Sequence, residues 1–147
     1  MGFNPRLYPL AARSAAFGSI ATNSSGRLPF FVAKAAGQVL SATIINGTSA
    51  SATSGTTAGS SIYVYLTKTS TATGSRIASF NGSGTAIATQ ASQALTMSTS
   101  TALTRFAAGD LFFAEFVGGA ANNGDTTGIH VQMDYIYGHA VDDSATP

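Results

Sequence analysis

The sequence predicts an all-β protein folded as a single antiparallel β-sandwich, and three observations support this prediction. Short stretches alternate apolar and polar residues with a period of two, which is typical of strands with one buried face. These stretches are rich in β-branched and aromatic residues and are separated by clusters of Gly, Asn, Asp and Ser. Helix signals are almost absent, because the Ala-rich segment 10–17 lies between Pro9 and Gly18 and has room for one or two turns at most.

Eight strands are expected along the chain. They cover residues 29–33, 38–45, 61–67, 76–80, 93–97, 102–106, 111–117 and 129–137. In the second of these, the alternation places Leu40, Ala42 and Ile44 together on one face. The commonest arrangement of eight antiparallel strands in two sheets is a jelly roll, and an immunoglobulin-like sandwich is the alternative.

The predicted strands define one sandwich domain, residues 29–138. Residues 1–28 have no strand pattern and are expected to form an extended N-terminal arm, and residues 139–147 a short C-terminal tail. The polar segments 48–60 and 118–128 are long for loops within a compact domain, so both are candidates for contact or specificity loops.

Composition excludes several classes of function. Charged residues make up 9% of the chain and the net charge is +1, with the seven Lys and Arg residues scattered, so nucleic acid is an unexpected partner. No apolar run reaches the length of a membrane span, and the N-terminal segment is a poor signal peptide, since Pro5 and Pro9 interrupt it. Without cysteine there is no disulfide and no thiolate metal site.

Few side chains could perform catalysis. His130 and Asp134 share a strand face with Gln132, which could be part of a metal or acid–base site, but a polar outer face is the favoured interpretation. Glu115 is expected near a sheet edge, paired with Arg105, or at a contact between subunits. We therefore expect no enzyme, no cofactor and no metal.

Two further features have mainly structural interpretations. Asp110 follows Gly109 at the entry to a strand, where Asp commonly accepts hydrogen bonds from nearby backbone amides. Tyr63 and Tyr65 alternate outward on one strand and could stack against a sugar or a protein, although an ordinary solvent-exposed face is favoured.

The N-terminal arm is the most informative anomaly, because so apolar a segment would not normally remain loose in water. It packs either on its own sandwich or, as we favour, along a neighbouring subunit. The residues expected to bind a partner are Phe3, Arg6, Leu7, Tyr8, Leu10, Arg13 and Phe17.

Residues 28–138 resemble the small β-sandwich decoration (cement) proteins of phage capsids. The resemblance rests on four stretches of sequence: LPFFVAKAAGQVLSATIINGT, SIYVYLTKT, ALTRFAAGDLFFAEFVG and IHVQMDYIYG. Where that pattern often has Ala-Pro, this chain has Ala33-Lys34.

The resemblance implies a jelly-roll fold, a homotrimer on the outer surface of the virion, and non-catalytic binding to adjacent copies of the major capsid protein. The alternative is a receptor- or glycan-binding sandwich of a phage tail or fibre. That alternative would use the loops 48–60 and 118–128 and the face that carries Tyr63 and Tyr65.

Overall fold

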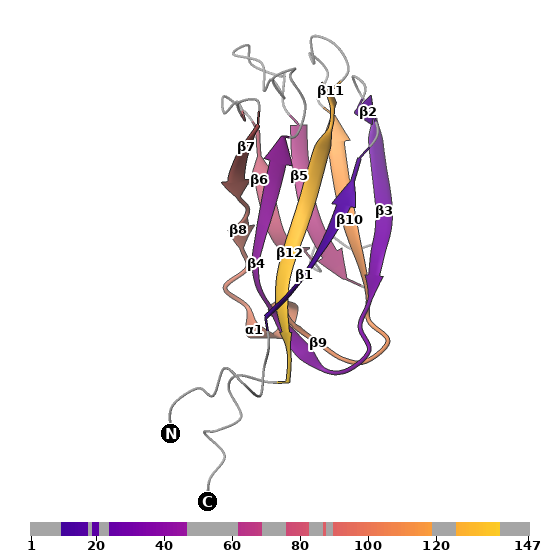
Figure 1. Ribbon diagram of the computed structural model, residues 1–147, viewed down its shortest axis with the longest axis vertical. Helices are drawn as coiled ribbons and strands as arrows, with labels where there is room; N and C mark the ends of the chain where they lie inside the picture. Colours follow the sequence, from indigo (N-terminus) through magenta and orange to yellow (C-terminus); the bar gives the residue numbers. More distant parts are fainter. Residues whose placement is uncertain are drawn as a thin grey trace, which may run out of the picture.

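A computed structural model gives the fold of the chain (Figure 1). The residues it describes are 10–17, 19–20, 24–46, 62–68, 76–82, 87, 90–118 and 126–138. In these ranges, no helix has the length and apolar character that a membrane crossing requires.

Two antiparallel sheets pack face to face, as predicted (Figure 1). The first has the order β1 (Ala11–Ala16), β12 (Ile129–Tyr137), β4 (Gly37–Asn46) and β7 (Ala91–Ala94), with β9 (Arg105–Phe106) also paired to β4. The second has the order β3 (Ser25–Val32), β10 (Leu111–Gly118), β5 (Ile62–Lys68), β6 (Arg76–Asn81) and β8 (Thr96–Met97). A two-stranded ribbon joins β11 (Thr126–Thr127) to β2 (Ser19–Ile20), and α1 (Thr101–Thr104) is a single helical turn.

The principal strands are nested in the manner of a jelly roll. Going inward from both ends of the chain, β1 pairs with β12, β3 with β10, β4 with β7, and β5 with β6. The pairs β12–β4 and β10–β5 then join these four hairpin-like pairs into two sheets. This nesting distinguishes the fold from an immunoglobulin-like sandwich and confirms the jelly-roll prediction.

Alternating residues of both sheets form one core between them. Val64 and Leu66 of β5 are buried against the first sheet, whereas Tyr63 and Tyr65 point outward and are half-buried. In the first half of β12, every second residue from Ile129 to Met133 is buried. After a register shift between Asp134 and Tyr135, β12 buries both Tyr135 and Ile136.

The two ends of the sandwich differ, and we name them by the strands that meet there. At the base, β1 and β10 begin and β3 and β12 end, so Ala11 lies opposite Tyr135 and Leu111 opposite Val32. At the apex, Asn46 of β4 lies opposite Ile129, and Gly118 of β10 lies opposite Ile62.

Three predictions about the extent of strands are wrong. Residues 11–16 belong to the sandwich as edge strand β1, although no strand was expected before residue 29. Residues 102–106 were expected to be a strand, but they contribute to α1 and to the two-residue β9. The expected strand 93–97 is divided, because β7 ends at Ala94 in the first sheet and β8 begins at Thr96 in the second.

Leu40 also departs from its predicted place on the same face as Ala42 and Ile44. The register shift that separates Asp134 from Tyr135 leaves Leu40 as the unpaired residue of β4. A bulge of this kind turns the following side chains to the other face, so Leu40 is 45% exposed while Ala42 and Ile44 are buried.

Candidate binding surfaces

Exposed large apolar side chains gather toward the base. Leu10 precedes β1 and is 66% exposed, and Val32 ends β3 and is 48% exposed. Leu40, in the base half of β4, and Leu28, midway along β3, complete the described set. Single exposed apolar residues are ordinary, but three of the four in the described part of the chain lie in the base half, which makes this end a candidate contact surface.

A shallow apolar pocket of about 270 Å³ lies on the same part of β3. Its lining residues are Pro29, Phe30, Phe31, Val32 and Leu111. Strand β3 is an edge strand, since β10 is its one neighbour in the second sheet. The pocket therefore adjoins backbone that, among the described strands, has no partner on its outer side.

The predicted arm residues have different positions. Phe3, Arg6, Leu7 and Tyr8 lie outside the described residues, and they precede Leu10, which is at the base. Arg13 is exposed on β1, and its guanidinium carbon lies 5.7 Å from the centre of the Phe31 ring.

Phe17 is a correction to the predicted partner-binding set. It is 5% exposed and packs edge-on against Phe116 of β10, with ring centres 5.0 Å apart. Its backbone amide donates a hydrogen bond to the carbonyl of Ile129 at 2.8 Å. Phe17 therefore belongs to the core of its own sandwich and presents no surface to a neighbour.

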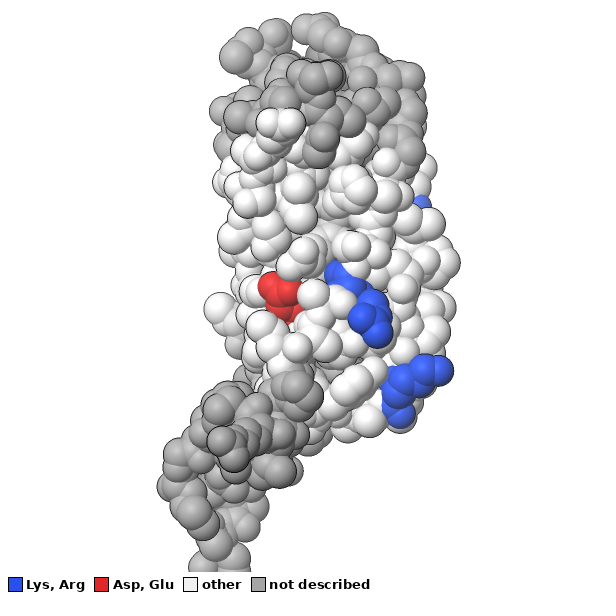
Figure 2. Space-filling model, in the orientation of Figure 1, with Lys and Arg blue, Asp and Glu red and all other residues white. Residues whose placement is uncertain are grey.

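The two outer faces of the sandwich differ in character. Figure 2 shows the first sheet toward the viewer, and its described surface is almost entirely uncharged, with isolated basic and acidic groups. Across β12, β4 and β1 this face carries small or neutral polar residues such as Ser14, Thr43 and Gln132. Asp134 accepts hydrogen bonds from Ser41 Oγ at 2.7 Å and from Gln132 Nε2 at 2.9 Å.

These hydrogen bonds support the polar-face interpretation of His130 and Asp134. Both oxygens of the Asp134 carboxylate are occupied by neighbouring side chains on the same face. Among the described residues, no three His, Cys, Asp or Glu side chains are grouped as metal ligands.

The outer face of the second sheet carries two arginines, each stacked on an aromatic ring. The Arg27 guanidinium carbon lies 4.0 Å from the centre of the Phe113 ring, and Arg27 Nη2 donates to Thr67 Oγ1 at 3.2 Å. Glu115 is directly across from Arg27 in the strand register. The predicted partner Arg105 is instead part of β9 in the first sheet.

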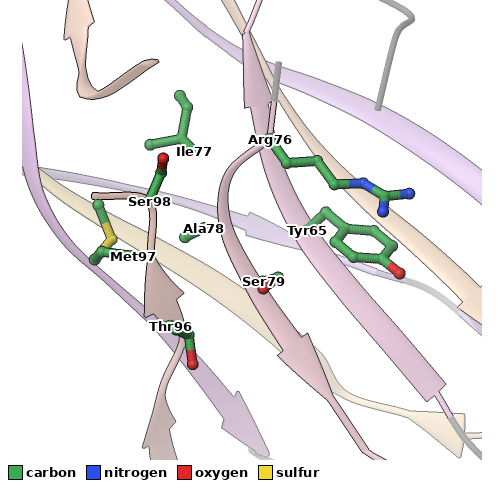
Figure 3. Close-up of a pocket in the computed structure, with 8 residues that line it drawn as sticks. All are labelled: Tyr65, Arg76, Ile77, Ala78, Ser79, Thr96, Met97 and Ser98. Atoms are coloured by element: carbon green, nitrogen blue, oxygen red, sulfur yellow. The ribbon is translucent and has the colours of Figure 1, made fainter. Parts of the chain in front are cut away.

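The second stack borders a pocket of about 210 Å³ (Figure 3). The guanidinium carbon of Arg76 lies 3.5 Å from the centre of the Tyr65 ring. Strand β6 contributes Arg76 and Ser79, and β8 with the residue after it contributes Thr96, Met97 and Ser98. Ile77 and Ala78 complete the lining. Sequence reasoning identified Tyr65 but not the residues that pairing brings around it.

Asp110 has the turn role that was predicted for it. Its Oδ2 accepts a hydrogen bond from the amide of Ala107 at 3.0 Å and lies 4.0 Å from Lys68 Nζ. Lys68 Nζ also donates to the carbonyls of Ala102 and Arg105. Partial burial lowers the pKa of Lys68, and the nearby carboxylate of Asp110 acts in the opposite direction.

The predicted loops 48–60 and 118–128 fall mostly outside the described residues. The strands that flank the first loop are β4 and β5, and those that flank the second are β10 and β11. Both connections therefore leave from the apex, where Asn46 faces Ile129 and Gly118 faces Ile62.

No protein-family model matches the chain, and no curated protein matches it.

Proposed function

We propose that this protein is a capsid decoration protein. It binds the outer surface of a phage capsid through its base and stabilises contacts between copies of the major capsid protein, without catalysis. It does so as a homotrimer, and neither nucleic acid nor a membrane is among its partners.

One observation carries the proposal: the exposed apolar side chains and the point where residues 1–9 join the sandwich are at the same end. Leu10 and Val32 are exposed at the base, and residues 1–9 continue from Leu10. Protein interfaces have apolar centres that are poor in charge. With the base against the capsid, the apex and its two long connections face outward.

The test is binding of the purified protein to heads of the phage that encodes it. Expanded and unexpanded heads are incubated with the protein and pelleted, and the bound protein is quantified. Binding to expanded heads at a copy number that matches the local symmetry axes supports the proposal. A copy number that fits no symmetry axis contradicts it.

Substitutions identify the end that binds. In the double variant Leu10→Asp, Val32→Asp, charges replace exposed apolar side chains at the base, so we expect the affinity for heads to fall at least about tenfold. The control is Ser92→Asp, which adds a charge on the exposed apex half of β7 and should leave binding unchanged. If Ser92→Asp abolishes binding and the double variant does not, the apex is the binding end.

The trimer is tested separately, by light scattering of the protein in solution. A mass close to three times the 14.8 kDa of one chain is expected. A protein that is monomeric both in solution and on heads contradicts this part of the proposal.

A further inference from the structure

The Arg76–Tyr65 stack differs from its counterpart on the same sheet in what surrounds the guanidinium. Arg27 donates to Thr67 Oγ1 and lies across from the carboxylate-bearing Glu115. Arg76 stacks on Tyr65 but, within the described part of the chain, it makes no side-chain hydrogen bond and no ion pair. The ring fixes the plane of this guanidinium and leaves its N–H edges available.

A guanidinium held in this way suits a carboxylate. The planar fork of N–H donors matches the two oxygens of a carboxylate, and an arginine that is already stacked loses less side-chain entropy when it binds. The surrounding pocket shows that the site is concave rather than a flat patch of sheet. Figure 3 shows Arg76 extending over the Tyr65 ring on one side, with Met97 and Ser98 on the other.

The remaining lining supplies hydroxyl groups that can bond to the hydroxyls of a sugar ring. Ser79 and Thr96 face each other across the β6–β8 pairing, and both hydroxyls can donate and accept hydrogen bonds. Ile77 and Ala78 are buried and Met97 packs against the core, so the side chains of the lining that a ligand can reach include Tyr65, Arg76, Ser79 and Thr96. The volume of about 210 Å³ is smaller than the roughly 300–1,000 Å³ of pockets for drug-sized ligands, and so suits one ring.

From these features we infer that the pocket between β5, β6 and β8 is a binding site for a carboxylated sugar such as a uronic acid. The carboxylate pairs with Arg76, and the ring hydroxyls bond to Ser79 and Thr96. A protein partner is less suitable, because a stable protein interface covers about 800 Å² on each side and this pocket accommodates a single small group. The inference is independent of the capsid proposal, since the pocket lies on the outer face of the second sheet.

The test uses trigalacturonic acid and its methyl ester, which has the same rings without the negative charges. Binding is followed by NMR titration of the backbone amides of the full chain. We expect the acid to shift signals from β5, β6 and β8 at millimolar concentration, and the ester to bind at least about tenfold more weakly, as loss of a charge-assisted hydrogen bond implies. Equal affinity for both compounds would show that the carboxylate is not recognised.

Substitution of each stacked arginine shows whether binding depends on the Arg76–Tyr65 stack or on the Arg27–Phe113 stack. Arg76→Gln should weaken binding of the acid at least about tenfold, whereas Arg27→Gln, which disrupts the Phe113 stack, should change it less than about twofold. Tyr65→Phe retains the ring beneath Arg76 and should bind nearly as well as the native chain. Unchanged binding by Arg76→Gln overturns the inference.

Two further measurements complete the design. Thermal unfolding of each variant confirms that a loss of binding does not come from a loss of folding. A Glu-rich hexapeptide tests the other source of carboxylates: tighter binding of the peptide than of trigalacturonic acid would make this a protein-docking site and refute the sugar assignment.

Discussion

The base and the apex of the sandwich are closed in different ways. Near the base, five aromatic rings form a continuous series of contacts with ring centres 4.8 to 6.2 Å apart; they belong to Phe31, Phe106, Phe112, Tyr135 and Tyr137. The described apex has the single ring pair Phe17–Phe116 and a buried amide, Asn46, whose Nδ2 donates to the carbonyl of Ile87 at 3.1 Å.

The comparison has a consequence for binding. The end that carries the exposed apolar side chains is also the end with the more extensive aromatic core beneath them. Side chains held on a rigid, preformed support lose little freedom when a partner covers them, so more of the contact energy contributes to affinity.

The largest expected effect is a loss of stability on Gly37→Ala, a substitution that tests how closely the base is packed. A Cβ atom at Gly37 would overlap the backbone carbonyl oxygen of Ile136 and the ring of Phe106, whereas a Cβ at Gly26, near the apex, would lie 2.6 Å from the ring atom Phe116 Cε1. Backbone in a paired strand cannot move aside as a side chain can. We expect Gly37→Ala to lower the free energy of unfolding by about 3 kcal/mol and Gly26→Ala by about 1 kcal/mol. Urea unfolding measures both, and equal losses would contradict the comparison.

A smaller effect is expected at Lys68, which connects β5 to the carbonyls of Ala102 and Arg105. Lys68→Met keeps an unbranched side chain but removes these hydrogen bonds, so we expect unfolding to require about 1–2 kcal/mol less free energy. Lys34→Met, at an exposed position between β3 and β4, is the matched control and should change stability by less than about 0.5 kcal/mol. If both substitutions lower the free energy of unfolding equally, the Lys68 hydrogen bonds do not stabilise the base.

The smallest effect concerns alkaline pH. Burial, followed by the neighbouring Tyr137 side chain, raises the pKa of Tyr135 above its usual value of 10.0. Above pH 10.0 the Tyr135 hydroxyl ionises more readily in the unfolded state than in the folded state. The stability that Tyr135 contributes is therefore fully present below pH 10.0 and is lost as the pH rises through the folded-state pKa. In thermal unfolding between pH 9 and 11, Tyr135→Phe should lose less stability than the native chain; a steeper loss in the variant would contradict this cause.

The alternation of residues predicted the long strands well, because each of them has one buried face. The strands expected at 111–117 and 129–137 agree with β10 and β12 to within one residue. Strand β1 was missed because its sequence, AARSAA, has low strand propensity, and its conformation depends on pairing with β12. The helical turn α1 was missed for a related reason, since Lys68 from a distant strand donates a hydrogen bond to the carbonyl of Ala102 in α1.

The candidate sites were less predictable than the fold. The sequence placed Tyr65 on an outward face, and the structure agrees. What surrounds Tyr65 depends on strand order and register: β6 pairs with β5 and β8 pairs with β6, which brings Arg76 and Met97 to the same pocket. Phe17 was expected to bind a partner because it lies outside every predicted strand, but it is buried in the core of its own domain.

The nested order of the strands also determines when the base can form during folding. Because β1 pairs with β12, the first described strand has no partner in its sheet until residues 129–137 have been synthesised. Pairing between such distant segments is slow to nucleate, because the chain loses the entropy of loop closure before the stabilising contacts between the strands form. A chain that ends before residue 129 therefore lacks the β1–β12 pair and, with it, an assembled base.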